Sequence, residues 1–403
     1  MDSSAPHRLP QLAKVFFKLG AIGFGGPAAH IAMMEDEVVN RHKWLTREQF
    51  LDLVGATNLI PGPNSTEMAI HVGYIYAGWL GLIVAGICFI GPAVVITGAF
   101  AWAYVVFGQL PQVAPLLYGI KPAVLAIILG AIWKLGKTAV KNRKLLLIAV
   151  AVVVALFLGL NEVIALLLGG LLGMLWLRLS QKRNNGTGTG FNGWLIGFSF
   201  HPLLSQLSTA SPVASPAAPT LWQLGLFFLK VGSVLFGSGY VLVAFLEEGL
   251  VGQGWLTQQQ LLDAIAIGQF TPGPVSSTAT FIGYVIAGWP GAVVATLGIF
   301  LPSFLFVAAL NPLIPRLRSS PWASAFLDAV NVSAIALMAA VTVQLARGTL
   351  LVSTGTQLNI DWPALFIAII AAGAAIRLRV SAVWLVLGGA LMGWLANLIL
   401  ING

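Results

Sequence analysis

Five apolar runs in this sequence each exceed the roughly 20 residues with which a helix crosses a bilayer. They lie at residues 79–107, 113–133, 289–310, 322–345 and 380–401. Two shorter runs, 145–160 and 163–177, are separated only by Asn161 and Glu162, which predicts a tight helical hairpin. Charged residues make up only 8% of the chain, against about 25% in a soluble domain. The sequence therefore predicts an all-α, multi-pass membrane protein, with the lipid bilayer as its solvent. We expect it in the cell inner (plasma) membrane.

The net charge of +8 does not indicate a nucleic-acid partner, because most Lys and Arg residues lie in short loops between apolar runs. Cys88 is the single cysteine, so no disulfide forms within the chain. The sequence has no phosphate loop and no cluster of metal ligands, and we expect no enzyme activity, no catalytic residues, no metal and no cofactor. A serine nucleophile paired with a histidine stays open, although nothing singles one out.

The first half of the chain is repeated in the second half. FFKLGAIGFGG at 16–26 matches FLKVGSVLFGSG at 228–239, and LIPGPNSTEMAIHVGYIYAGW at 59–79 matches FTPGPVSSTATFIGYVIAGW at 270–289. The offset between matched positions stays between 210 and 212 residues. We expect a first repeat over residues 1–180, a Gly/Ser/Asn/Pro-rich linker over 181–220 and a second repeat over 221–403. The apolar patch of the linker, 191–204, is too short to predict as a span.

Loop charges predict how the two repeats are oriented. In the first repeat the loop at 107–115 has no Lys or Arg, whereas the loop at 134–144 has five. In the second repeat the pattern is reversed: the loop at 311–321 carries Arg316 and Arg318, and the loop at 348–362 carries none. Positive loops face the cytoplasm, so equivalent loops face opposite sides. This predicts an inverted-topology repeat, as in many secondary transporters, with about five spans in each half and ten in all. The side of the N-terminus is left open.

Each repeat contains a Pro-Gly-Pro sequence that a helix cannot pass through. The residues are Pro61, Gly62 and Pro63 in the first repeat and Pro272, Gly273 and Pro274 in the second. Inside a membrane, such a break is tolerated only where it is buried in protein or lines a polar cavity. The sequence predicts broken or re-entrant helices here and does not decide between them.

Small polar side chains follow each break, and they favour the start of a new helix. They are Asn64, Ser65 and Thr66 in the first repeat and Ser276, Ser277 and Thr278 in the second. Helix N-termini bind anions through free N–H groups and the helix dipole. Because inverted repeats bring two broken helices to one central site, these residues predict a binding site for a tetrahedral oxyanion. The alternative is that the prolines only kink the helices and the hydroxyls bond their own backbone.

A glycine motif precedes each break, with Gly25 and Gly26 in GFGGPAAH and Gly237 and Gly239 in LFGSGYV. Glycine permits close backbone approach, so these residues are candidates for an amide-lined wall of the same site. Tight helix packing through small residues is the alternative.

Charged residues near the apolar runs are further candidates. Lys18 and Lys230 occupy equivalent positions and could attract an anion, or they could extend to the membrane surface. Lys121 is a possible anion contact with Asn331 at the equivalent position. Glu35 and Glu247 are a shared pair that could partner the lysines or relay protons. Glu67, His30 and His71 occur only in the first repeat, where they either couple protonation to transport or simply pack.

Three stretches resemble the chromate ion transporter (CHR) family in its long, two-domain form. They are FGGPAAHIAMMEDEVV, PGPNSTEMAIHVGY and GQFTPGPVSSTATFIGY, and the resemblance covers nearly the whole chain except the linker. The glycine motif of the second repeat departs from the fuller form, because Ser238 replaces a glycine and no proline or histidine follows Gly239.

This resemblance implies that the chain exports chromate from the cytoplasm and confers chromate resistance, with sulfate as a structural analogue. Transport by alternating access would be driven by the membrane potential or by proton exchange. A carrier for sulfate or another anion, and an intramembrane enzyme or scaffold, stay open as alternatives. The sequence also leaves open whether the chain forms a homodimer.

Overall fold

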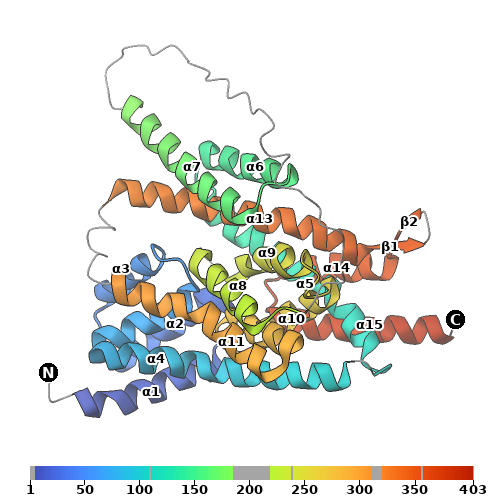
Figure 1. Ribbon diagram of the computed structural model, residues 1–403, viewed down its shortest axis with the longest axis horizontal. Coiled ribbons are helices and arrows are strands. Elements are labelled where there is room, and N and C mark those ends of the chain that lie inside the picture. Colours follow the sequence, from blue (N-terminus) through green and yellow to red (C-terminus); the bar gives the residue numbers. More distant parts are fainter. Residues whose placement is uncertain are drawn as a thin grey trace.

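The structure is a computed structural model that describes residues 5–108, 110–184, 218–236, 239–310, 320–354 and 357–402. Helices dominate these residues (Figure 1). Most of the predicted linker, including its apolar patch at 191–204, lies outside the described residues.

The first half contains seven α-helices within its described residues. They are α1 (Ala5–Ile22), α2 (Gly26–Glu35), α3 (Arg47–Thr57), α4 (Asn64–Phe107), α5 (Ala114–Ala139), α6 (Arg143–Phe157) and α7 (Glu162–Asn184), with the π-helix η1 (Asp36–Arg41) between α2 and α3. The turn at Asn161 joins α6 to α7 and the two helices pack together, as the predicted hairpin requires.

The second half repeats this order of elements. It contains α8 (Leu221–Val234), η3 (Gly239–Val241), α9 (Leu242–Leu246), η4 (Glu247–Val251), α10 (Gln258–Phe270), η5 (Val275–Ser277), α11 (Thr278–Leu310), α13 (Pro321–Leu350), α14 (Trp362–Ile376) and α15 (Ala382–Asn402). One element was not predicted: strands β1 (Leu351–Thr354) and β2 (Gln357–Ile360) pair as an antiparallel hairpin between α13 and α14.

The described residues include five helices that are long and apolar enough to cross a membrane. They are Asn64–Phe107, Ala114–Ala139, Glu162–Ser180, Val275–Ala309 and Pro321–Leu350. Shorter apolar helices cover Leu221–Val234, Trp362–Ile376 and Ala382–Leu398. The predicted class, a helical membrane protein, is therefore confirmed.

Helix α4 folds back sharply near its start and is in effect two helices. Ala77 and Gly78 leave the helical conformation, with φ of −140° and 63°. A positive φ of this kind is cheap only for glycine. The bend brings Gly73 so close to the second segment that a Cβ on it would lie 2.5 Å from the Ala85 Cβ. Helix α11 bends in the same way at Ala287 and Gly288.

The main helix contacts between the halves occur twice, the second time with the roles of the two halves exchanged. Helix α5 packs against α14 and α15, and its counterpart α13 packs against α6 and α7. Helices α4 and α11 pack against each other. Contacts that recur with the two halves exchanged are those of an isologous, two-fold arrangement. In Figure 1, α4 ends and α5 begins on the right, whereas α11 ends and α13 begins on the left.

The first helix of each half packs against the long helix behind the break. Helix α1 packs on α4, and α8 packs on α11. The approach is close because Gly20 faces the backbone of Phe89 and Gly232 faces the backbone of Ile299. These contacts build the core around the breaks.

Candidate functional site

Both Pro-Gly-Pro sequences interrupt a helix, as predicted. Helix α3 ends at Thr57 and α4 starts at Asn64, while α10 ends at Phe270 and the turn η5 leads into α11. Gly62 and Gly273 have φ of 145° and 89°, a conformation that favours glycine. A new helix starts at Asn64, as predicted, and η5 leads into α11 after the second break. The N-caps are Pro63 and Pro274, and neither has a side-chain cap hydrogen bond.

Each break is anchored by the glycine motif of the other half. The Gly62 N–H donates to the Leu235 carbonyl at 2.5 Å, and the Gly273 N–H donates to the Gly23 carbonyl at 2.7 Å. Leu235 and Gly23 are equivalent positions of the repeat. The breaks and the glycine motifs therefore form one unit at the interface between the halves.

Packing leaves no room for a larger residue at either break. A Cβ at Gly62 would meet Glu67 and would lie 2.6 Å from the Ser303 Oγ, and a Cβ at Gly273 would lie 2.8 Å from the Ala93 Cβ. Ser303 and Ala93 are again equivalent positions. Each break thus rests on the long helix of the opposite half.

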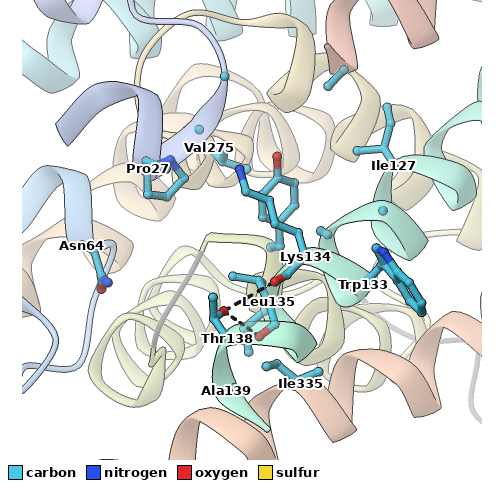
Figure 2. Close-up of a pocket in the computed structure, with 18 of the residues that line it drawn as sticks. Pro27, Asn64, Ile127, Trp133, Lys134, Leu135, Thr138, Ala139, Val275 and Ile335 are labelled. Carbon is cyan, nitrogen blue, oxygen red and sulfur yellow. Dashed lines mark hydrogen bonds between the residues drawn. The ribbon is translucent and has the colours of Figure 1, made fainter. Parts of the chain in front are cut away.

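A cavity of about 1300 Å³ lies beside the two breaks. Gly25, Gly26 and Asn64 line it from the first half, and Gly273 and Val275 line it from the second. Helices α5 and α13 complete its wall (Figure 2). The structure therefore brings one glycine motif and both breaks to a shared space.

The cavity has an excess of positive charge. Its charged lining residues are Lys134, Lys137, Lys141, Arg379 and Asp328. Asp328 is paired with Lys141, whose Nζ lies 2.7 Å from its Oδ1. Because a surface of one sign attracts ligands of the other, the cavity is suited to an anion.

Amide side chains add neutral hydrogen-bonding groups. Asn64 Nδ2 donates to Asn58 Oδ1 at 2.8 Å, and Gln269 occupies the position equivalent to Asn58 in the second half. All three residues line the cavity. Gln269 is 8% exposed and its Nε2 has no hydrogen-bond partner among the described residues.

Comparison with known proteins identifies the family. The sequence profile of the chromate transporter family matches residues 10–174 and 222–394, which is most of the chain. This chain belongs to the chromate transporter family. Like other members, it is a multi-pass protein of the cell membrane, and its family is one of transporters.

Named relatives of this chromate transporter family member match over nearly their whole length. A chromate transport protein of Cupriavidus metallidurans is 33% identical, over 98% of this chain and 95% of its own. A probable chromate transport protein of Synechococcus elongatus is 34% identical, over 85% and 86%. A chromate transport protein of Pseudomonas aeruginosa is 30% identical, over 97% and 93%. No solved structure matches this chain.

The hydroxyl side chains after the breaks are buried behind the cavity wall rather than lining it. Ser277 accepts a hydrogen bond from Thr97 at 3.1 Å, and Thr278 donates to the Val275 carbonyl at 2.7 Å. Ser65, Thr66 and Ser276 are also buried. Direct contact between these hydroxyls and a ligand would need a rearrangement of the wall in this transporter.

The predicted second glycine motif is placed only in part. Gly239 is buried, and a Cβ on it would lie 3.2 Å from the Val275 Cβ, so it packs behind the second break. Gly237 lies outside the described residues.

The predicted lysines lie away from the cavity lining. Lys18 forms an ion pair with Glu37 at 2.8 Å. Lys230 is exposed on α8. Lys121 lies close enough to Asp263 for an electrostatic interaction. Glu35, the proposed partner of a lysine, instead pairs with Arg47 at 3.4 Å.

Glu67 and His71 lie one turn apart on α4, and the other candidates for proton coupling lie on α2 and η4. His30 is buried and its Nε2 donates to the Gly23 carbonyl, the same oxygen that holds the second break. Glu67 is fully buried, and neither of its carboxylate oxygens has a hydrogen-bond partner among the described residues. His71 is also fully buried, and Glu247 is half-buried on η4.

Sequence reasoning missed Lys134, Gln269 and Arg379. It took Lys134 as one of five loop charges that set orientation, it took Arg379 as a charge of the same kind at a turn of the second repeat, and it assigned no role to Gln269. The one available signal was the alignment of Gln269 with Asn58, which places an amide before each break. Which loop charges face the cavity depends on how α5 and α14 pack, and the residue pattern does not contain that information.

Proposed function

We propose that this protein exports chromate from the cytoplasm by alternating access and thereby confers chromate resistance. The observation that carries the proposal is the positively charged cavity between the two broken helices, in a chain whose relatives are named chromate transport proteins. A tetrahedral oxyanion bound there would meet the cations of α5 and the amide groups of the breaks.

An inverted-topology repeat is part of this proposal. We assign five spans to each half: α1, α4, α5, α6 and α7 in the first, and α8, α11, α13, α14 and α15 in the second. The exchanged contacts and the opposite directions of α4 and α11 in Figure 1 support it. Broken helices at the interface of such repeats form the substrate site of many transporters.

The charge distribution supports loading from the cytoplasm. Lys134 and Lys137 lie in the last turns of α5, Lys141 follows the end of α5, and Arg379 follows α14. Segments rich in Lys and Arg face the cytoplasm, and these residues line the cavity. The conformation described is therefore one in which a cytoplasmic anion reaches the breaks.

Energetics favour export without ATP. Moving a dianion outward through an inside-negative potential releases roughly 2 × 2.3, or about 4.6, kcal/mol per 100 mV. Proton exchange through Glu67, His30, His71, Glu35 or Glu247 is the second coupling that we consider.

Chromate flux into inside-out vesicles tests the proposal. An imposed potential, positive inside the vesicles, should speed uptake, and a protein with Pro61→Ala and Pro272→Ala should lose it. If chromate uptake by the wild-type protein does not change with the imposed potential, transport driven by the membrane potential is ruled out. Uptake equal to that of empty vesicles would rule out chromate transport.

Sulfate is the second candidate substrate, because it shares the charge and tetrahedral shape of chromate. The cations and amides of the cavity recognise these properties, and neither is specific to chromium. Competition between chromate, sulfate and molybdate in the same vesicles ranks the substrates.

A further inference from the structure

Among the described residues, the cavity cation Lys134 forms no ion pair. We propose that Lys134 and Gln269 bind the transported oxyanion directly, Lys134 as its counter-charge and Gln269 as a neutral hydrogen-bond donor. This inference rests on the proposed function and names the residues that hold the substrate in the cytoplasm-facing state.

Lys134 projects into the cavity from the last turns of α5. Figure 2 shows its side chain reaching toward Pro27 and Val275, and the residue is exposed to the cavity space. Val275 is the first residue after the second break. Within the described part of the chain, no acidic side chain forms an ion pair with Lys134. Its ammonium group is therefore free to neutralise a ligand.

Two of the neighbouring cations contact other protein groups. Lys141 is paired with Asp328, and the Lys137 ammonium lies 4.5 Å from the centroid of the Trp133 ring. Arg379 follows α14, and it is the competing candidate for the same role. The direction of the Lys134 side chain toward the second break favours Lys134.

Gln269 supplies a donor that nothing else in the described residues uses. It lies three residues before Pro272, it is 8% exposed, and its Nε2 lacks a partner. A buried donor left unsatisfied costs about 1–3 kcal/mol, and native proteins rarely tolerate it. The end of α10 also lies beside Val275, since a Cβ at Gly268 would be 3.5 Å from the Val275 carbonyl. An oxyanion near Val275 would satisfy the amide.

The pair suits a ligand that must be released. A lysine ammonium is a point charge with three rotatable donors, so it fits a tetrahedral anion without requiring a planar, two-pronged partner. A single lysine leaves a dianion incompletely neutralised. The anion is then attracted into the cavity without being trapped there.

Initial rates of chromate uptake into inside-out vesicles test this assignment. Lys134→Gln should raise the KM for chromate by about tenfold or more, which is the size expected for a lost charge-assisted hydrogen bond. Lys134→Arg should retain most of the affinity. Gln269→Leu, which removes the donor at similar volume, should raise the KM several-fold.

Lys144→Gln is the matched control, because it removes one positive charge from the same positive segment outside the cavity lining. Chromate protection of the detergent-purified protein against heat gives a second readout, independent of turnover, and it should fall in Lys134→Gln but not in Lys144→Gln. A KM for Lys134→Gln equal to that for Lys144→Gln would overturn the assignment, as would an effect confined to Arg379→Gln. If the wild-type protein neither transports chromate nor is protected by it, the proposed function itself fails.

Discussion

At the scale of single residues, lysines that look alike in the sequence differ in the structure by whether they form an ion pair with an acidic side chain. Lys18 was predicted to attract an anion, and it lies against Glu37, which also accepts from Arg41 at 3.0 Å. Lys134 was taken as a loop charge, and it faces the cavity without an acidic partner in the described chain. An ion-paired lysine has little charge left for a ligand, so the two side chains should respond differently to substitution.

Replacement of Lys18 by Gln should leave the KM for chromate within about twofold of the wild-type value. The Lys18 side chain is 47% exposed, and Arg41 stays paired with Glu37 in the variant, so the loss of stability should stay below about 1 kcal/mol. Uptake kinetics and the thermal unfolding midpoint of the purified protein measure these effects. A large rise in KM for Lys18→Gln would return this residue to the binding site.

Glu37→Ala should be more damaging than Lys18→Gln. The carboxylate is 7% exposed and serves both Lys18 and Arg41. Its loss should cost about 1–3 kcal/mol, since charged hydrogen bonds contribute on this scale. Glu48→Ala is the control, because Glu48 is exposed on α3. Equal unfolding midpoints for the two variants would contradict the role assigned to Glu37.

At the scale of elements, the bends in α4 and α11 shape the helix that follows each break. Both bends have the same backbone conformation, with φ of 63° at Gly78 and at Gly288. Each returns a short helix, which starts at the break, toward a long helix that can cross the membrane. The bend therefore positions the break against the opposite half.

Substitution at the bend separates backbone strain from steric overlap. A Cβ at Gly78 meets nothing within 4 Å, so Gly78→Ala should cost only its strain, about 1–3 kcal/mol. Gly73→Ala adds a Cβ only 2.5 Å from the Ala85 Cβ, and it should lower the yield of folded protein further. Gly91→Ala in the same helix meets nothing and should be neutral. Unfolding midpoints in detergent rank the three, and a neutral Gly73→Ala would disprove the close approach.

At the scale of the whole molecule, alternating access would exchange the two arrangements of a pseudo-symmetric pair of halves. The reciprocal bonds of Gly62 to Leu235 and of Gly273 to Gly23 hold the breaks in one unit. The cavity lining differs between the halves, since Asn64 of the first half occupies the position of Val275 in the second. In the outward-facing state, the two halves would exchange these contacts on the opposite side of the molecule, and the site would open to the outside.

Cysteine labelling tests the inverted topology. In a Cys88→Ala background, Arg143→Cys lies at the first residue of α6, next to the connection from α5, and Asn359→Cys lies on the equivalent connection between α13 and α14. A membrane-impermeant maleimide should label Arg143→Cys from the cytoplasmic side and Asn359→Cys from the outside. Labelling of both positions from the same side would refute the inverted repeat and, with it, our account of the central site.

The amino-acid sequence by itself determined the helical membrane class and the positions of the two breaks. It could do so because apolar length and proline stereochemistry act locally: a run of 20 apolar residues or a Pro-Gly-Pro has much the same effect in any fold. The repeat could also be recognised from the sequence alone, because matched positions recur at a nearly constant offset.

Tertiary structure decided which side chains share the cavity. The partner of Lys18, the free ammonium of Lys134 and the burial of Ser276 all depend on contacts between residues far apart in the chain. Such contacts arise when α5 packs on α14 and α15 and when each break docks on the opposite half. A local sequence pattern does not specify that docking, because a lysine in the same sequence context can lie free in a loop, form an ion pair or bind a ligand.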